Sequence, residues 1–387
     1  MDNKYLGLTP PMGWNSWNTF TEEINEKVVK ESADIIVESG LFDAGYEYVV
    51  IDDCWSLKER DKDGRLQADP EKFPSGMKAV ADYVHSKGLK FGMYSCNGPL
   101  TCAHYPGSFD HEFIDAETFA EWGVDFLKYD NCFKPKIDGN ILYRRMAMAL
   151  RNCGRDILFS ACNWGAESSE KWINSTGAQM YRSTGDIRDS WQSIKTLALS
   201  QIGKITHSGP YCFNDIDMLV VGMYGRSTNE LIANSDISAC TDLDYRTHFA
   251  FWCMMNSPLM IGCDIRSMSE ATKKTLMNRD LIAINQDIEG RNPYYLGSDP
   301  DNPRECFWMV KMLSNGDIAL GAFNFSDKKR TMTLQLFDIG LPVTTGKCLR
   351  AYDCVNQEDA GIFSEIVDLK VEAHDCKIFR CKIEDLK

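Results

Sequence analysis

Residues 126–132 read Phe-Leu-Lys-Tyr-Asp-Asn-Cys, a short apolar and aromatic run that stops at an acid and an amide. Such a run is typical of a buried β-strand whose carboxyl end carries polar side chains. Further runs of the same kind precede residue 290, with helical patterns between them. The predicted strands span residues 12–14, 46–53, 90–96, 126–131, 157–163, 180–186, 212–218 and 259–264.

Helical segments separate these strands. Asn25 is predicted to cap a helix that buries Val28 and Ile36 and stops before Gly40. A second helix is predicted to begin at Asp115, and others cover residues 75–85, 142–152, 190–199 and 245–256. Eight strand–helix units in the first part of the chain indicate an α/β fold, a (β/α)₈ TIM barrel.

The pattern changes after about residue 295. Short alternating runs predict strands over residues 306–313, 318–325, 331–337, 347–352, 365–371 and 377–382, with a hairpin turn at Ser314-Asn315-Gly316-Asp317. We therefore predict a catalytic barrel over residues 1–294 and an all-β sandwich domain over residues 295–387. The second domain shows no candidate chemistry, and we expect it to serve packing.

Composition limits the partners. The 387 residues include 42 lysines and arginines against 56 acids, a formal net charge of −14. This charge repels nucleic acids and anionic membranes, so we expect neither as a partner. The sequence holds no P-loop, no GxSxG elbow and no zinc-ligand spacing of histidines and cysteines. We expect a neutral small-molecule substrate, no metal and no organic cofactor.

Two features predict a cytoplasmic protein. The first residues lack the basic and apolar segments of a signal peptide. The 15 cysteines are an odd number scattered along the chain, so we expect most of them to be reduced core residues.

Polar or acidic residues end most of the predicted strands. In a barrel these carboxyl ends converge on the face where such enzymes place their active sites. The strand-end residues are Asp52, Asp53, Asp130, Asn163, Asp186, Asp215, Asp217 and Asp264. Two facing carboxyl groups can cleave a glycosidic bond, because one protonates the leaving oxygen while the other meets the developing positive charge. Asp130 and Asp186, on the fourth and sixth predicted strands, are the candidate pair.

Spacing suggests a role for each member of this pair. Lys128 lies two residues before Asp130, so both side chains share one face of the strand. A neighbouring ammonium favours the ionised carboxylate that a nucleophile requires. Asp186 has no cation at that spacing, so we expect its pKa to be raised, as suits a general acid. A strand-end aspartate that only caps the next helix is an equally good interpretation of either residue taken alone.

Eight motifs then occur in order along nearly the whole chain, and the set is far more specific than any one of them. They are Pro10-Pro11-Met12-Gly13-Trp14-Asn15-Ser16-Trp17, Ile51-Asp52-Asp53-Cys54-Trp55, Gly92-Met93-Tyr94, Phe119-Ala120-Glu121-Trp122-Gly123-Val124-Asp125, Leu127-Lys128-Tyr129-Asp130-Asn131-Cys132, Gly185-Asp186-Ile187, Asn214-Asp215-Ile216-Asp217-Met218 and Ala283-Ile284-Asn285-Gln286-Asp287. With them the chain resembles glycoside hydrolase family 27, the clan D α-galactosidases and α-N-acetylgalactosaminidases. The family's barrel and C-terminal β-sandwich agree with the predicted domains.

The resemblance implies a retaining α-galactosidase that works by double displacement. Asp130 falls where the family has its nucleophile, and Asp186 falls where it has its acid/base. The resemblance further places Trp14 as an apolar wall, Asp52 and Asp53 as acceptors for the sugar's 6- and 4-hydroxyls, and Arg182 at the 2- and 3-hydroxyls. The remaining implied pocket residues are Tyr94, Lys128, Asn163, Trp164, Asp217 and Met218.

Two positions bear on the choice of sugar. Many relatives have Glu where this chain has Asn163, and the N-acetylgalactosaminidases use small residues in this stretch to admit an acetamide. Asn163 can hydrogen-bond a 2-hydroxyl, which favours galactose, whereas the small Ala166 leaves N-acetylgalactosamine open. A β-L-arabinopyranosidase on the same scaffold is a further alternative.

The cysteines depart from the family pattern. The partners that relatives use for the equivalents of Cys54 and Cys162 are missing. Cys102 and Cys132 alone keep the positions of a family disulfide, and their redox state is left open. The loss of two bridges fits a reducing compartment.

Other functions use the same residues. A catalytically dead galactose-binding protein typically lacks one of the two acids, and this chain keeps both. A transglycosylase would pass galactose to a sugar instead of water. Assembly into a homo-oligomer is compatible with the sequence.

Overall fold

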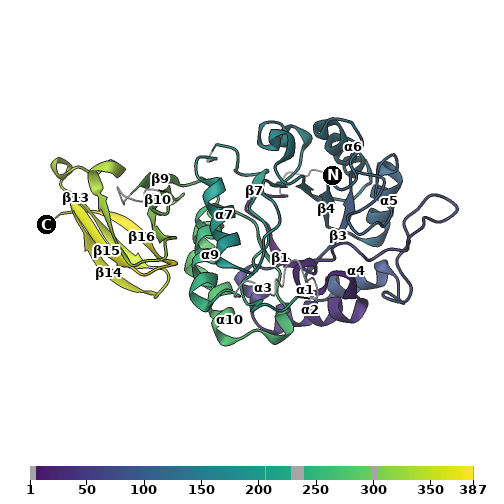
Figure 1. The fold of residues 1–387 in the computed structure, drawn as a ribbon, viewed down its shortest axis with the longest axis horizontal. Helices are drawn as coiled ribbons and strands as arrows, with labels where there is room; N and C mark the ends of the chain where they lie inside the picture. Colours follow the sequence, from purple (N-terminus) through teal and green to yellow (C-terminus); the bar gives the residue numbers. More distant parts are fainter. Residues whose placement is uncertain (1–5, 205, 228–238, 298–303, 387) are drawn as a thin grey trace.

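The computed structural model describes residues 6–204, 206–227, 239–297 and 304–386. It consists of a barrel built from the first three quarters of the chain and a sheet domain built from the rest. In Figure 1 the sheet domain lies beside the barrel, and α9 lies on the barrel flank that faces it. Among the described residues, no helix combines the length and the apolar content needed to cross a membrane.

The barrel contains the eight predicted parallel strands, most of them shorter than predicted. They pair in the order β7-β6-β5-β4-β3-β2-β1-β8, and a parallel bridge between Leu219 and Ile261 joins the segment after β7 to β8. The fold class predicted from the sequence is confirmed. The strands are β1 (Met12–Asn15), β2 (Tyr48–Val50), β3 (Lys90–Cys96), β4 (Phe126–Asp130), β5 (Leu158–Cys162), β6 (Met180–Arg182), β7 (Phe213–Asp215) and β8 (Leu259–Ile261).

The register of β3 and β4 places the candidate nucleophile. Tyr94 pairs with Lys128 and Cys96 pairs with Asp130, and the two residues of each strand are two positions apart, so all four side chains lie on one face of the paired strands. The strands are almost wholly buried, because apolar residues fill both the barrel interior and the layer under the helices. The polar side chains at their carboxyl ends are thereby held on a rigid base.

Helices surround the barrel, and local capping explains several of their limits. The Asn25 side chain accepts from Val28 N at the start of α2, as predicted. The predicted cap at Asp115 is wrong, because α5 begins at Glu112 and Asp115 instead forms a buried ion pair with Arg60. The barrel-region helices are α1 (Trp17–Phe20), α2 (Glu26–Glu38), α3 (Leu41–Ala44), α4 (Met77–Ser86), α5 (Glu112–Trp122), α6 (Gly139–Asn152), α7 (Trp191–Gln201), α9 (Asp242–Met254), α10 (Glu270–Leu276) and α11 (Arg279–Asn285).

The C-terminal domain pairs a six-stranded sheet with a two-stranded one. The orders are β14-β13-β16-β11-β10-β9 and β12-β15, and all strand pairs are antiparallel. Two strands were not predicted: β9 has only four residues, and β14 is an acidic edge strand containing a glycine. The strands are β9 (Tyr294–Gly297), β10 (Cys306–Met312), β11 (Ile318–Asn324), β12 (Arg330–Gln335), β13 (Lys347–Asp353), β14 (Glu358–Phe363), β15 (Ile366–Val371) and β16 (Asp375–Asp385).

One buried lysine joins the two domains. Lys311 of β10 is fully buried and donates hydrogen bonds to Asn256 Oδ1, just beyond α9, and to the carbonyl of Ile284 in α11. Burial lowers the pKa of Lys311 to about 7. An ammonium at this position must therefore lose most of its hydration when the domains pack.

The lowered pKa of Lys311 makes the free energy of unfolding depend on pH, and the direction of that dependence follows from the shift. Unfolded lysine keeps its proton to about pH 10.4, whereas folded Lys311 releases it above about pH 7, so the unfolded state binds more protons in between. The unfolding free energy of the wild type, minus that of Lys311→Met, should therefore rise between pH 7 and pH 9, by roughly 1.4 kcal/mol per pH unit at most. Urea titrations at several pH values measure this difference. Lys382→Met, at an exposed site of β16, is the control that should show no such rise.

Candidate active site

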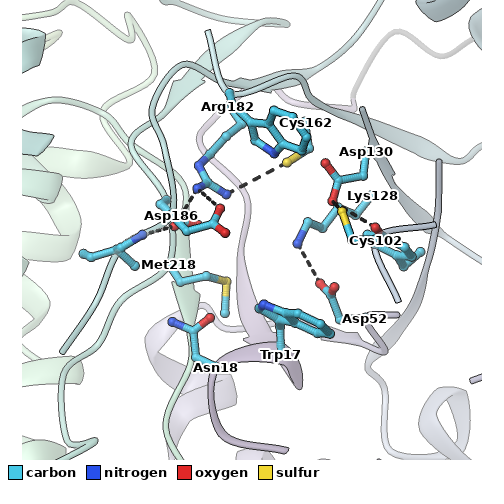
Figure 2. Close-up of a pocket in the computed structure, with 14 residues that line it drawn as sticks. Trp17, Asn18, Asp52, Cys102, Lys128, Asp130, Cys162, Arg182, Asp186 and Met218 are labelled. Atoms are coloured by element: carbon cyan, nitrogen blue, oxygen red, sulfur yellow. Dashed lines mark hydrogen bonds and ion pairs between the residues drawn. The ribbon is translucent and has the colours of Figure 1, made fainter. Parts of the chain in front are cut away.

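A partly enclosed pocket opens at the carboxyl ends of the barrel strands. Figure 2 shows polar side chains from several strands pointing into it, with Met218 and Trp17 forming part of its wall. The lining residues are Trp17, Asn18, Asp52, Tyr94, Cys102, Lys128, Asp130, Cys162, Trp164, Arg182, Asp186, Ile187, Asp217 and Met218.

Asp130, the last residue of β4, lies on the pocket wall with only 6% of its surface exposed. Its Oδ2 accepts from the Tyr94 hydroxyl at 2.9 Å, and its Oδ1 accepts from the backbone N–H of Asn131 at 2.8 Å. These bonds fix the orientation of the carboxylate. Burial raises the pKa of Asp130, and the charge of Lys128 and the two hydrogen bonds oppose that rise.

The predicted partnership of Lys128 and Asp130 needs correction. The Lys128 ammonium binds Asp52 Oδ2 at 2.8 Å, as Figure 2 shows, and Asn15 Nδ2 donates to the same oxygen at 2.8 Å. Lys128 and Asp130 do share a face of β4, but the nearest carboxylate to the ammonium comes from the end of β2. Lys128 therefore lowers the pKa of Asp130 through its field without a direct contact, and this influence is smaller than that of burial.

No cation lies two residues before Asp186, as expected, but the raised pKa predicted for Asp186 is wrong, because Arg182 reaches it from four residues away. Arg182 Nη2 lies 2.8 Å from Asp186 Oδ1 and 2.8 Å from Asp217 Oδ2, so one guanidinium serves two carboxylates. Partial burial raises the pKa of Asp186, but the charge and hydrogen bond of Arg182 outweigh it and leave the pKa lowered. The expectation from side-chain alternation along a strand failed here, because β6 ends at Arg182 and Asp186 lies in the irregular segment beyond it.

Asp217 differs from Asp186 in its surroundings. Its side chain is 8% exposed, against 73% for Asp186 at the pocket mouth. Burial raises the pKa of Asp217 to about 6 despite the nearby Arg182, and the neighbouring charge of Asp186 adds to the rise. Because both acids share Arg182, their titration belongs to the pair rather than to either residue.

Three predicted pocket residues do not line the pocket. Trp14 is fully buried, and its Nε1 donates to the carbonyl of Cys263; Trp17, three residues later, lines the pocket instead. The Asn163 amide closes its own turn, donating to Ala166 O and accepting from Gly165 N. Local backbone contacts thus engage side chains that were expected to meet the sugar.

Asp53 is the third of these residues. Its carboxylate accepts from the backbone N–H groups of Cys54 and Ala103, at 2.8 and 3.0 Å. Burial raises the pKa of Asp53 to about 6, while these hydrogen bonds act against the rise. Through its hydrogen bond with Ala103, Asp53 therefore stabilises the loop that carries Cys102 beside the pocket.

The other predicted residues line the pocket as expected: Asp52, Tyr94, Lys128, Asp130, Trp164, Arg182, Asp186, Asp217 and Met218. Sequence reasoning missed Trp17, Asn18, Cys162 and Ile187. Cys162 ends β5, so the strand-end rule could have found it, but an uncharged thiol gives no chemical signal. Its sulfur lies 3.9 Å from Arg182 Nη1.

A disulfide joins Cys102 to Cys132, with Cα atoms 5.2 Å apart. The Cys102 sulfur lies 3.7 Å from Asp130 Oδ2, so the bridge forms part of the wall behind that carboxylate. The two sulfur atoms and an Asp130 oxygen lie within 4.8 Å of one another. As a metal site this group fits poorly, because disulfide sulfurs carry no thiolate to bind a cation.

The charges of the pocket indicate what it can stabilise. Asp52, Asp130, Asp186 and Asp217 contribute four carboxylates, against the two cations of Lys128 and Arg182. A partly closed pocket with this excess of acid favours positive charge in a bound molecule. An oxocarbenium-like transition state develops such charge, and the exposed Asp186 and buried Asp130 are a suitable acid and nucleophile.

Comparisons with known proteins agree with this geometry. The family model described as "Alpha galactosidase A" matches residues 9–287, and the one described as "Alpha galactosidase C-terminal beta sandwich domain" matches residues 307–381. An α-galactosidase of Cyamopsis tetragonoloba is 41% identical over 375 residues, which cover 97% of this chain and 86% of that protein. The chain belongs to the α-galactosidase family, glycoside hydrolase family 27.

Solved structures support the same assignment. α-Galactosidase I from Mortierella vinacea is 31% identical with a TM-score of 0.88, and the match covers 98% of each chain. The α-galactosidase of Saccharomyces cerevisiae, solved with raffinose, is 29% identical with a TM-score of 0.85 and 99% of each chain covered. Barrel and sandwich are thus common to all three structures.

The cysteine arrangement can be counted directly. Thirteen cysteines are free and one pair is bridged. Alkylation of the denatured protein without reductant should therefore modify 13 thiols, and alkylation after reduction should modify all 15. Intact-mass spectrometry reads both numbers, and peptide mapping should place the two additional labels on Cys102 and Cys132. Fifteen labels without reductant would show that the bridge is open in the purified protein.

Proposed function

We propose that this chain is a retaining α-galactosidase that hydrolyses terminal α-D-galactosyl residues of oligosaccharides or glycoconjugates by double displacement. The observation that carries the proposal is the pair Asp130 and Asp186 lining one pocket, the first buried and oriented, the second at the mouth. Family membership supports the choice of galactose. A non-catalytic galactose-binding protein would need neither acid in this arrangement.

In the proposed first step Asp130 attacks the anomeric carbon while Asp186 gives its proton to the leaving oxygen. The bond to the aglycone breaks, and a β-linked galactosyl ester forms on Asp130. Asp186, now ionised, takes a proton from water, and the water oxygen displaces Asp130 to release galactose with its α configuration retained. The Tyr94 hydroxyl holds Asp130 in position for attack.

The hydrogen bond between Arg182 and Asp186 influences the pKa of the group that donates the proton in the first step. In the sugar-free pocket Arg182 lowers the pKa of Asp186, which is unfavourable for a proton donor. We propose that the 2- and 3-hydroxyls of the sugar accept hydrogen bonds from Arg182 and weaken its hold on Asp186. The bound sugar also displaces water from the pocket, and both effects raise the pKa of Asp186 where the proton is needed.

The choice of sugar remains a proposal, with galactose preferred over N-acetylgalactosamine. Cys162 and Trp164 are among the wall residues, and an acetamide in place of the 2-hydroxyl needs more room than the hydroxyl. A β-L-arabinopyranosidase and a transglycosylase stay as alternatives, because both would use the same two acids. We further propose a cytoplasmic location, supported by the thirteen cysteines that form no disulfide.

The roles of the two acids can be separated by azide rescue. Asp130→Ala should lower kcat by at least about 10⁴-fold, because no covalent intermediate forms. With α-galactosyl fluoride, added azide should attack from the vacant side and yield the β-galactosyl azide. Asp186→Ala should keep its activity best on substrates with good leaving groups, and azide should then give the α-galactosyl azide. NMR of the products identifies the anomers.

Asp264→Asn is the matched control for these variants. Asp264 also follows a barrel strand, but it pairs with Arg266 away from the pocket lining. Its activity should stay within about twofold of the wild type. An Asp130→Ala enzyme with ordinary turnover would refute the assignment of the nucleophile.

A substrate panel tests the specificity. We expect the 4-nitrophenyl α-galactoside to be hydrolysed with a kcat/KM at least about 100-fold above that of the α-N-acetylgalactosaminide, because the acetamide is larger than the 2-hydroxyl that it replaces. The β-L-arabinopyranoside, which lacks the hydroxymethyl group, should fall between them. Equal rates on the first two substrates would refute the preference. Product analysis at high concentrations of a sugar acceptor separates hydrolysis from transglycosylation.

A further inference from the structure

We propose that Trp252 of α9, a residue outside the pocket, is a positioning residue for the acid/base Asp186 and acts on it through Asp217. This inference rests on the proposed function, because it concerns the step in which Asp186 protonates the leaving group. Trp252 is fully buried, and its indole N–H donates to the backbone carbonyl of Asp217 at 2.8 Å.

Asp217 holds the surroundings of Asp186 at two points. One of its carboxylate oxygens pairs with Arg182, which itself binds Asp186. The same oxygen accepts the backbone N–H of Ile187, the residue after Asp186, at 2.7 Å. A shift of Asp217 would therefore move both the cation beside Asp186 and the chain segment that carries it.

The backbone of Asp217 cannot hold itself in place. Its φ is 95°, a left-handed value that residues with side chains adopt rarely and at a cost that surrounding contacts must offset. Two hydrogen bonds supply that constraint: Asp217 N–H donates to Asp215 Oδ1 at 2.8 Å, and Asp217 C=O accepts from Trp252. The indole bond comes from a separate helix, so of the two bonds it is the one that ties Asp217 itself to another barrel element.

A second contact from α9 lies one helical turn earlier. His248 Nε2 accepts the backbone N–H of Val220 at 3.2 Å, and the imidazole packs edge-on against Trp252, with ring centres 4.0 Å apart. Burial lowers the pKa of His248 to about 3, so the ring stays neutral and able to accept. The side chains of His248 and Trp252, both on α9, thus form hydrogen bonds to the backbone of the segment that begins at Asp217.

The C-terminal domain fixes α9 from behind. Phe251, next to Trp252, packs with its ring centre 5.4 Å from Phe323 and 5.6 Å from Phe325 of the sheet domain. Figure 1 shows α9 on the barrel flank facing that domain. The sheet domain therefore supports the position of Trp252, although it contributes no residue to the pocket lining among the described residues.

A shorter contact chain supports the same segment. Lys311 of the sheet domain binds Asn256, and the next residue, Ser257, accepts the backbone N–H of Ile216 through its Oγ at 3.1 Å. Ile216 immediately precedes Asp217. Ser257 thus offers a second, smaller side chain through which the proposal can be tested.

The test compares two substrates of the same sugar. Trp252→Phe keeps an aromatic ring in the core but removes the indole N–H. For melibiose, whose sugar leaving group must be protonated, kcat/KM should fall about tenfold or more, because Asp186 is misplaced. For 2,4-dinitrophenyl α-galactoside, whose leaving group departs without a proton, kcat/KM should fall less than about twofold. Ser257→Ala should shift the ratio of the two values in the same direction by about threefold.

Trp308→Phe is the matched control. Trp308 is also a fully buried tryptophan, but its indole nitrogen has no hydrogen-bond partner among the described residues, and it lies in the sheet-domain core. This variant should leave the ratio of the two substrates unchanged. Circular dichroism and thermal melts confirm folding of each variant.

The outcomes are distinguishable. Equal losses on both substrates in Trp252→Phe and in Ser257→Ala would overturn the inference, because they indicate a smaller active fraction and not a defect in protonation. An unchanged ratio in the folded Ser257→Ala variant decides against it even if Trp252→Phe fails to fold. A wild-type protein inactive on both galactosides would instead overturn the proposed function, and with it this inference.

Discussion

The guanidinium of Arg182 is the interaction on which the arrangement of the site depends. It is buried, it comes from the last residue of β6, and it binds two carboxylates that would otherwise repel each other. A buried cation without partners is strongly unfavourable, so Arg182 requires Asp217 as much as Asp217 requires Arg182. Asp186 is the third member, and it is held at the pocket mouth because the other two are fixed below it.

Much of the fold follows from local sequence patterns. The run 126–132 shows a buried strand because apolar and aromatic residues stop abruptly at Asp130, and β4 ends there. The edge strand β14 was not predicted, because an edge strand tolerates acidic residues and a glycine that a central strand would exclude. The helix start at Glu112 was missed because its preceding residue, His111, forms no side-chain cap, while Asp115 resembles a cap but binds Arg60.

The sequence predicted the positions of site residues only where those residues lie on strands. Alternation along β4 correctly places Lys128 and Asp130 on one face, yet it cannot show that Asp52 from β2 is nearer to the ammonium. Beyond Arg182 the chain leaves the strand, so spacing no longer predicts which groups meet Asp186. Trp14 and Trp17 illustrate the same limit, because the strand ends at Asn15 and only the later tryptophan faces the pocket.

The sheet domain gains a physical role from this geometry. Its core could have been an independent packing unit, but its aromatic side chains contact Phe251 and its lysine reaches Asn256, at the two positions that flank the Trp252 region of α9. A strained residue such as Asp217 needs rigid neighbours, since the strain would otherwise relax by moving the backbone. A barrel helix exposed to solvent on its outer face would be a weaker support than one packed between two cores. The second domain is therefore best understood as part of the structure that keeps the acid in place.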